Sequence, residues 1–359
     1  PVSGGLYSDF YYAIYRCNVV LESFDLVGDL AESEELRLTA ESRFVRAFGH
    51  WGLVKIYAKP YGYTPDNSHL GVPLRTSASQ EPIPRATVGD VYASIVQDME
   101  FAAENLPEEN GAYATKWAAL AALAEIHFLM GNAEQAANYA SQVIDSGAFS
   151  LDPDLDRFET DEINPETIFG IVSMPFDFRS SAFRDNLRSD NNPTPQLAFS
   201  EDFAFFMNLS GGGDARSDWY TPGTRALCNR FNGKEYFNVP VLHLTALKLI
   251  RAEALAASGG DLALAIQDIN DIRDRAFGPG NNTFEAATAE EVVLAARDEY
   301  RKETICEGRW TEQLLRRGAA GEDISIRDGA WDCPGMSLQF PNSETTAAGF
   351  ELNGEGGCL

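Results

Sequence analysis

The sequence predicts a mainly α protein of tetratricopeptide-like helical hairpins, with one long irregular, loop-rich region and short strands. Two segments of the 359-residue chain, 115–146 and 239–276, each read as two alanine-rich helices joined by a turn that contains glycine. Between them, Pro, Gly, Asn and Ser dominate residues 148–238, and no clear periodicity runs through that region. Hydrophobic residues make up 44% of the chain, so wholesale disorder is excluded.

Apolar residues at helical spacing predict a first helix over 7–24 and a second over 41–57. The second carries a stripe of aromatic residues, and such a stripe on a soluble helix faces a core. Pro60 lacks an amide hydrogen and disfavours helical geometry before it, so this helix should end near Tyr57. A short acidic link over 29–35 is expected between the two helices.

Two threonines mark further helix starts. Thr87 and Thr288 each precede an acidic residue by three positions, the spacing that lets both side chains satisfy free backbone amides. The helices that begin there should run to about Leu106 and Glu307. Residues 168–172 are apolar and β-branched or aromatic in the main, which predicts a short strand.

The most regular segment is the first hairpin. Thr115 is expected to cap a helix that runs to Met130, and Gly131–Asn132 forms the turn into a second helix that ends near Ser146. The same pattern returns in the second hairpin, where Gly259 occupies the place of the first turn. Two imperfect copies are not a tandem array, but they indicate helical pairs of one type.

The charge of the chain restricts its partners. A formal net charge of −26 repels nucleic acid and anionic lipid headgroups, so neither is expected as a ligand. An acidic surface that is poor in lysine is typical of a saline habitat, and a generally acidic secreted protein explains it equally well. No run is long and apolar enough to span a bilayer.

The five cysteines form no C-x-x-C pair, which leaves a zinc site or a thioredoxin-type motif without support. Cys333 and Cys358 bracket a tail rich in Gly, Ser and Asn, and a disulfide between them is expected in an oxidising compartment.

Motifs for catalysis and for metal binding are missing from the sequence. The four histidines are isolated, and neither H-E-x-x-H nor G-x-S-x-G occurs. Asp152, Asp154 and Asp156 alternate like the start of a calcium loop, but Arg157 stands where glycine is required, so a solvated loop is favoured. No catalytic residue, metal or cofactor is therefore expected.

Aromatic side chains on connections are the candidates for ligand binding. Sugar rings present apolar C–H faces that stack on Trp and Tyr, while Asn, Asp and Arg bond their hydroxyls. For each of these candidates, ordinary anchoring of a loop is an equally good explanation. Three other tryptophans lie on predicted helices and are expected in the core: Trp51, Trp117 and Trp310. The best stacking platform is predicted at Trp219 and Tyr220. The full set of tentative ligand-binding residues is Tyr61, Tyr63, Asn208, Arg216, Asp218, Trp219, Tyr220, Tyr236 and Trp331.

Six segments, in order, resemble the SusD/RagB family of surface nutrient-binding lipoproteins. The first is YSDFYYAIYRCNVVL, and the next, ESRFVRAFGHWGLVKIYAKP, resembles the family's E-A-R-F-L-R-A-x-x-Y-F-x-L-V-x-x-Y-G, although Gly49 and Gly52 depart from it. Four further segments complete the series: GVPLR with the threonine-led helix that follows it, NPETIF at 164–169, the R-A-E and I-R-x-R-A runs of 239–276, and EGRWTEQLLRRG.

The resemblance implies a single helical domain over 1–359. Its hairpins are expected at about 7–147 and 239–318, a ligand-facing loop region at 148–238 and a loop tail at 319–359, with the family's usual N-terminal segment absent.

The family resemblance also implies a function. It suggests a non-catalytic receptor on the extracellular face of the outer membrane, held by a lipid anchor that this sequence lacks. Its ligand would be an oligosaccharide, or else a peptide, and its partner a SusC-like TonB-dependent transporter. The alternative is a tetratricopeptide-like adaptor that binds proteins on a concave helical face. A hydrolase ranks third and needs paired carboxylates in a cleft.

Overall fold

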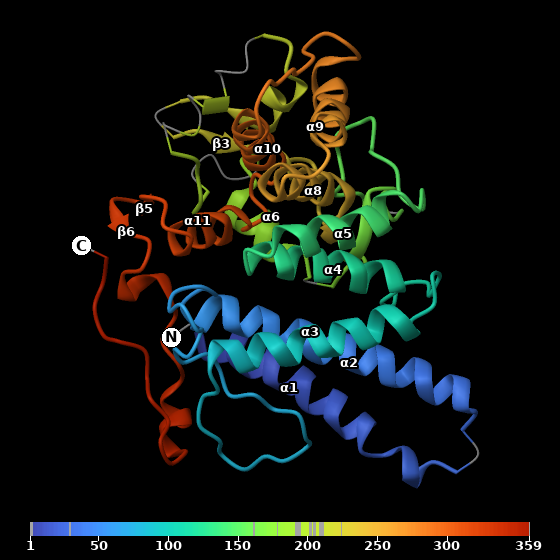
Figure 1. Cartoon of the computed structure of the whole chain (residues 1–359), viewed down its shortest axis with the longest axis vertical. Helices are drawn as coiled ribbons and strands as arrows, with labels where there is room; N and C mark the ends of the chain where they lie inside the picture. The colour runs from blue at the N-terminus through green and yellow to red at the C-terminus, as the bar shows by residue number, and fades with distance from the viewer. Residues whose placement is uncertain are drawn as a thin grey trace. The chain divides into compact units, whose positions relative to one another are not determined.

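The computed structural model describes residues 3–28, 30–160, 162–177, 179–190, 195–200, 203, 206–207, 212–223 and 225–358, with side chains from residue 5 onward. The described chain is mainly helical with short strands, which confirms the predicted fold class (Figure 1). It forms two compact units. Unit 1 comprises residues 1–132 and 311–359, and unit 2 comprises residues 133–310. That the whole chain acts as a single domain stays a prediction.

Unit 1 contains consecutive helices that pack on their neighbours in the sequence, α1 on α2, α2 on α3 and α3 on α4 (Figure 1). Its second stretch of chain adds most of α11 and a tail with one tiny hairpin and two short 3-10 turns. The elements are α1 (Ser3–Leu21), η1 (Phe24–Leu26), α2 (Glu32–Tyr57), α3 (Val88–Asn105), α4 (Lys116–Leu129), α11 (Trp310–Ala319), β5 (Ser325–Ile326), β6 (Gly329–Ala330), η3 (Pro334–Met336) and η4 (Asn342–Thr346).

Helix α2 shows where local sequence signals succeed and fail. It ends at Tyr57, as the proline at position 60 predicts. The expected acidic link before it is wrong, because the helix already begins at Glu32. Glu32, Glu34 and Glu35 lie in its first turn, where the positive end of the helix dipole favours carboxylates.

The two glycines of α2 have a packing reason. A Cβ on Gly49 would lie 2.9 Å from Cγ1 of Ile14, and one on Gly52 would lie 2.7 Å from the Phe10 ring. Both contacts are closer than real Cβ atoms allow, so glycine is what permits α1 to approach α2 this closely. On another side of α2, Trp51 is 2% exposed, as predicted.

A buried polar network connects the first three helices. Arg46 of α2 donates to both carboxylate oxygens of Asp98 on α3, at 2.8 Å each, and to Oδ1 of Asn18 on α1 at 2.9 Å. All three residues are less than 10% exposed. A bidentate guanidinium–carboxylate pair fixes orientation as well as distance, so this network sets how the three helices meet.

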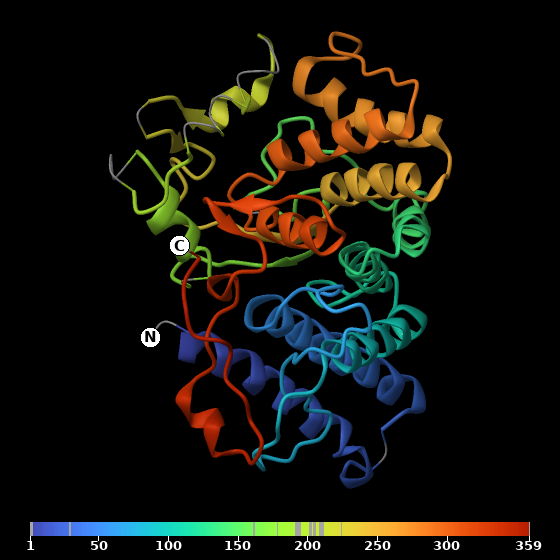
Figure 2. The ribbon, with the colours of Figure 1, turned by 60° about the vertical axis from the view of Figure 1, so that its left-hand side comes forward.

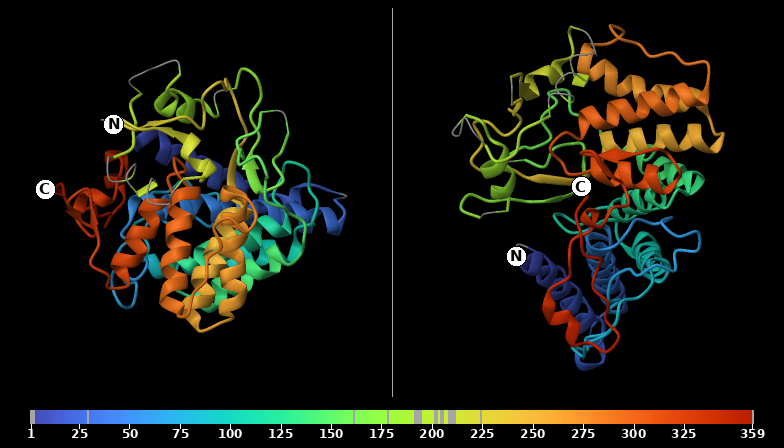
Figure 3. Two further views of the ribbon diagram at one scale, coloured as in Figure 1. Left: turned by 90° about the horizontal axis from the view of Figure 1, so that it is seen from above. Right: turned by 90° about the vertical axis from the view of Figure 1, so that its left-hand side faces the viewer.

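Unit 2 has α8 at its centre, in contact with α5, α9 and α10 (Figure 3). Strand β1 pairs antiparallel with β4, and β2 with β3. The elements are α5 (Ala133–Ile144), β1 (Thr167–Ile171), α6 (Ser181–Leu187), η2 (Ala215–Trp219), β2 (Tyr220–Thr221), β3 (Leu227–Cys228), β4 (Val239–His243), α8 (Leu244–Ser258), α9 (Leu262–Phe277) and α10 (Ala289–Glu303).

The sequence correctly predicts the hairpin of α8 and α9, whose turn uses Gly259 with a φ of 73°. It also predicts the capping box at Thr288, which opens α10. The sequence analysis does not predict strand β4, because the residues of β4 continue the apolar pattern of α8. Helix α10 stops at Glu303 rather than at 307, and Cys306, with a φ of 67°, turns the chain.

The loop-rich part of unit 2 is attached to α10 by buried ion pairs. Arg157 donates to Glu303 at 2.7 Å and to Glu307 at 2.8 Å, and the three side chains are at most 5% exposed. His243, at the start of α8, accepts from the amide of Ala246 through Nδ1, and its Nε2 lies 2.9 Å from Glu307. The irregular region is therefore ordered by charge as well as by apolar packing.

The tail of unit 1 runs along the end of α2 (Figure 2). The amide of Leu338 donates to the Ile56 carbonyl at 2.9 Å, and Asn353 donates to the Tyr57 carbonyl at 2.8 Å. The disulfide between Cys333 and Cys358 is present, which confirms the predicted pairing. None of the described helices combines the length and the hydrophobicity needed to cross a bilayer.

Candidate ligand-binding surface

The predicted ligand-binding residues divide between the two units. Tyr61, Tyr63 and Trp331 belong to unit 1. Arg216, Asp218, Trp219, Tyr220 and Tyr236 belong to unit 2. Asn208 lies outside the residues that the structure describes. Each group is described within its own unit, and its role in ligand binding stays a prediction.

Arg216 is a core residue of unit 2. Its side chain is 0% exposed and pairs with Asp214 at 2.8 Å, with Glu299 at 2.6 Å and with Glu303 at 3.1 Å. Burial by itself would lower the pKa of Arg216. The three carboxylates have the larger opposite effect, so the pKa is raised. With its donors directed at three buried acids, Arg216 fixes η2 against α10.

Trp219 and Tyr220 are covered by neighbouring side chains. Trp219 is 8% exposed and packs with Leu155 and Ile305, while the guanidinium of Arg230 lies 4.1 Å from its ring centroid. Tyr220 is 4% exposed. Stacking of a sugar on either ring would require these neighbours to move, and both rings contribute to the core of unit 2.

The remaining described candidates of unit 2 are more accessible. Asp218 is exposed, and its backbone carbonyl accepts a hydrogen bond from Asn229 at 3.3 Å. Tyr236 is half-buried. Both side chains are therefore open to solvent to a greater degree than Trp219 and Tyr220.

Unit 1 does bring predicted residues together. Tyr63 is 41% exposed, and its ring centroid lies 6.1 Å from that of Trp331 and 5.2 Å from that of His69, edge to face in both cases. Trp331 is half-buried and lies directly on Gly318 of α11, where a Cβ would overlap the indole. The close approach of the indole therefore depends on this glycine.

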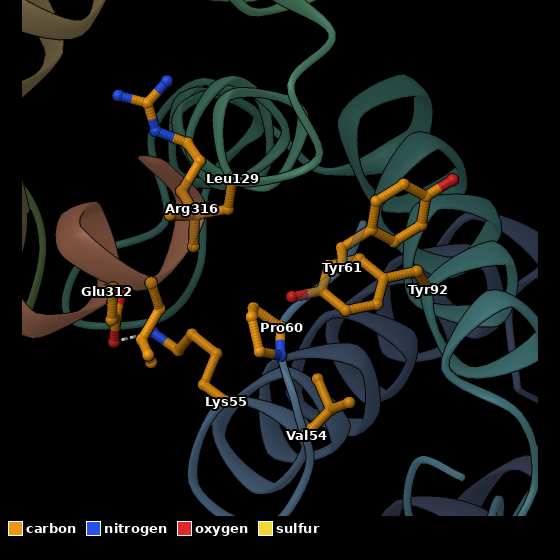
Figure 4. Close-up of a pocket in the computed structure, with 9 residues that line it drawn as sticks. Val54, Lys55, Pro60, Tyr61, Tyr92, Leu129, Glu312 and Arg316 are labelled. Atoms are coloured by element: carbon orange, nitrogen blue, oxygen red, sulfur yellow. Dashed lines mark ion pairs between the residues drawn. The ribbon is translucent and has the colours of Figure 1, made fainter. Parts of the chain in front are cut away.

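A small pocket adjoins this surface (Figure 4). Tyr61 and Tyr92 lie on one side of it, in edge-to-face contact at 5.1 Å, and Glu312 and Arg316 of α11 lie on the other. Lys55 pairs with Glu312 at 2.9 Å, with both side chains partly exposed. The floor is apolar and consists of Val54, Pro60, Leu129 and Leu315. This lining resembles that of a small-molecule site, but the volume of about 30 Å³ is well below the roughly 300–1,000 Å³ of such sites, so only a small part of a ligand could enter.

The loop that carries Tyr61 and Tyr63 is held by specific bonds. Gly62, with a φ of 86°, donates its amide to the Asn67 side chain at 2.6 Å. Thr64 and His69 are 2.9 Å apart through Oγ1 and Nδ1, and partial burial lowers the pKa of His69. Lys59 donates to the Cys333 carbonyl at 2.6 Å, which connects the loop to the disulfide-bonded tail. The aromatic surface is thus fixed before a ligand arrives.

Among the residues that the structure describes, no three His, Cys, Asp or Glu side chains form a metal-binding group. The expectation of a solvated loop at Asp152 is wrong, since this side chain is 5% exposed and accepts from the amides of Asp154 and Asp156. It shapes a turn.

Two family models match the chain. The one described as "Starch-binding associating with outer membrane" matches residues 3–128, and the one described as "SusD family" matches residues 230–331. A SusD-like protein of Formosa agariphila is 25% identical over 61% of this chain and 38% of the relative. A SusD-like protein of Bacteroides ovatus is 27% identical over 41% of this chain and 28% of the relative. The match thus spans about a third of the length of these relatives.

Solved structures share the fold. A SusD superfamily protein from Bacteroides thetaiotaomicron aligns with a TM-score of 0.84 at 22% identity, over 97% of this chain and 85% of that one. A protein from Bacteroides vulgatus described as a putative sugar binding protein aligns with a TM-score of 0.79 at 21% identity, over 97% of this chain and 84% of that one. At this level of identity the alignment establishes the arrangement of the backbone.

Proposed function

The chain belongs to the SusD/RagB family, and we propose that it is a non-catalytic receptor that captures an oligosaccharide. The family is one of carbohydrate and nutrient binding, which supports the ligand class. The observation that carries the proposal is the exposed ring of Tyr63 against Trp331, next to the pocket that Tyr61 lines.

The contacts with the ligand are assigned to unit 1. The faces of Tyr63 and Trp331 offer apolar surfaces for the C–H side of a sugar ring. Lys55, Glu312 and Arg316 line the small pocket beside them and offer charged donors and acceptors for hydroxyls at its mouth. Glu312 is the one carboxylic acid among the described residues that line the pocket, whereas a glycosidase needs a pair.

Calorimetric titration of the whole chain with neutral glucans, such as maltoheptaose, cellohexaose and laminarihexaose, tests this proposal. We expect saturable binding, with the sugar recovered intact by chromatography. Trp331→Ala and Tyr63→Ala should each raise the Kd about tenfold, the effect of losing one well-formed aromatic contact. Trp117→Ala is the matched control, since Trp117 is also half-buried in unit 1 but does not line the pocket. Cleavage of the sugar, or binding of short peptides alone, would refute the proposal.

A second variant separates the two groups of aromatic residues. Trp219→Ala removes a ring that packs with Leu155 and Ile305, so we expect it to lower the stability of unit 2 by about 3 kcal/mol. The Kd for the bound glucan should stay unchanged. A folded Trp219→Ala protein that has lost binding would instead establish the stacking platform predicted at Trp219 and Tyr220.

We further propose that the receptor is lipid-anchored on the extracellular face of the outer membrane and delivers its ligand to a SusC-like TonB-dependent transporter. The description of one matching family, which associates with the outer membrane, supports this location. The test is affinity purification of the tagged full-length protein from detergent-solubilised outer membranes. We expect a TonB-dependent barrel to copurify in stoichiometric amount. Recovery of the receptor alone, or its release without detergent, would contradict the assignment.

A further inference from the structure

A second concave surface of unit 1 lies along α1, separate from the pocket described above. It has a volume of about 360 Å³, within the range of small-molecule sites. Four tyrosines of α1 line it, together with Arg75 from the connection after α2 and Glu344 from η4. Figure 2 shows α1 (dark blue) beside the C-terminal tail (red) that carries η4. This surface is called the tyrosine groove, and its tyrosines are Tyr7, Tyr11, Tyr12 and Tyr15.

The tyrosines form a continuous row. Tyr7, Tyr11 and Tyr15 are four residues apart, so they lie on one side of α1, and the stripe extends for about 12 Å. The rings of Tyr7 and Tyr11 are 4.7 Å apart. Tyr12 lies beside this row, is 59% exposed and has the guanidinium of Arg16 at 4.9 Å from its ring centroid. Tyr12 and the half-buried Tyr15 give this row an accessible aromatic face for a ligand.

The opposite wall of the groove is fixed in place. Asn18 donates through Nδ2 to the carbonyls of Arg75, at 3.1 Å, and Ser77, at 2.9 Å. The Arg75 amide donates to Nε2 of His50 at 3.2 Å, and the Tyr11 hydroxyl donates to the Pro73 carbonyl at 2.8 Å. The buried network of α1, α2 and α3 therefore also holds this wall. A preformed groove loses little conformational entropy when a ligand binds.

Tyr7 closes one end of the groove. Its side chain is 4% exposed and lies beside Tyr11 and Glu344. Burial and these two neighbours raise the pKa of the Tyr7 hydroxyl, so it stays protonated at neutral pH. The side chains that a ligand can reach are therefore Tyr12, which is exposed, and Tyr15, which is half-buried.

The charges of the groove favour a neutral ligand. Arg75 and Glu344 balance each other within it. The guanidinium of Arg75 already donates to the carbonyls of Ser79, at 3.2 Å, and Glu81, at 3.1 Å. The net charge of −26 on the whole chain opposes the approach of polyanions. Tyrosine faces, side-chain hydroxyls and the Glu344 carboxylate match the alternating C–H faces and hydroxyls of a sugar chain.

We propose that the tyrosine groove is a second binding site of this receptor, which takes a neutral oligosaccharide along α1. The inference rests on the proposed function, but it concerns residues that do not line the first pocket. A chain with two sites would hold one polysaccharide at two points, and the local concentration of the second sugar segment would then strengthen the attachment.

The experiment measures stoichiometry and affinity by calorimetry with the neutral glucan of the panel that binds most tightly. We expect two sites per chain in the unaltered protein. Tyr12→Ala and Tyr15→Ala should each weaken one site by roughly 3- to 10-fold, the range of a single aromatic contact, and leave the other site unchanged. Trp331→Ala should have the complementary effect.

Two further variants keep the test decisive. Ser79→Trp fills the groove without removing any tyrosine and should abolish one site. Tyr113→Ala is the control, because Tyr113 is 69% exposed in unit 1 and lies outside the groove. One site that is sensitive only to Trp331→Ala would overturn the tyrosine groove and leave the proposed function intact. Absence of any glucan binding would overturn both. Peptide binding that Ser79→Trp blocks would overturn the assignment of a sugar.

Discussion

Replacing Glu303 with glutamine is expected to destabilise unit 2 by about 3 kcal/mol. The Glu303 carboxylate is 0% exposed and accepts hydrogen bonds from Arg157 at 2.7 Å, from Arg275 at 2.8 Å and from Arg216 at 3.1 Å. Glutamine has nearly the same volume, so packing changes little. It removes the charge, and its amide nitrogen cannot accept a hydrogen bond from a guanidinium. The buried arginines then lose their shared counter-charge.

Two independent arguments give the same magnitude. Burial alone would raise the pKa of Glu303, but the three arginines outweigh it and hold the pKa at about 2, compared with 4.5 for an ordinary glutamate. This difference corresponds to about 3 kcal/mol of stability at neutral pH. Removal of one partner from a buried ion pair costs roughly 3–5 kcal/mol.

The pH dependence of the effect identifies its cause. Because the pKa of Glu303 is lower in the folded state, its contribution is complete above pH 4.5 and is lost as the pH falls toward 2. The difference in unfolding free energy between wild type and Glu303→Gln should therefore shrink to roughly half by pH 3.

Urea unfolding at several pH values, followed by circular dichroism and tryptophan fluorescence, measures this difference. Glu290→Gln, an exposed change in the first turn of the same helix, is the control and should shift stability by less than about 0.5 kcal/mol. A cost below 1 kcal/mol for Glu303→Gln, or one that does not vary with pH, would refute the role of the ion pairs.

Three other variants test separate features. Replacing Cys333 and Cys358 with serine opens a loop of 25 residues and should cost about 3 kcal/mol in denaturant unfolding, with no further loss on adding reductant. Gly318→Ala adds a methyl group that displaces the Trp331 indole, so it should raise the Kd for glucan, as measured by calorimetric titration. The higher helix propensity of alanine acts on stability and does not compensate for the lost contact with the ligand. Burial lowers the pKa of His243 from 6.5 to about 4, so unfolding takes up a proton between these values and stability falls by about 3 kcal/mol as the pH drops from 6.5 to 4. His243→Gln should lack this component in urea titrations.

Local chemistry made much of the fold predictable. The caps at Thr87, Thr115 and Thr288 are side-chain bonds within one turn of chain, so the threonine itself marks the helix start, and all three open helices. The proline-induced end of α2 is equally local. The start of α2 at Glu32 was missed because a run of acidic residues suits both a solvated link and a helical first turn.

The candidate site was less predictable because exposure is set by residues far away in the sequence. Trp219 lies in a polar stretch that reads as an open loop, yet Ile305 and Arg230 cover it. Conversely, Tyr12 lies on a helix with a regular apolar pattern, yet its ring is exposed. Periodicity reports which residues share a face, and only tertiary packing decides what covers that face.

The division of unit 1 into two stretches of chain has a consequence for biosynthesis. Residues 133–310 lie between them, so the first stretch is synthesised well before the second. Helices α1 to α4 can associate without the second stretch because their contacts join neighbours in the sequence. Glu312, Arg316 and Trp331 arrive only afterwards. The binding surface proposed at Tyr63 and Trp331 can thus form only after the second stretch has joined the first, and a chain halted before residue 311 would lack it.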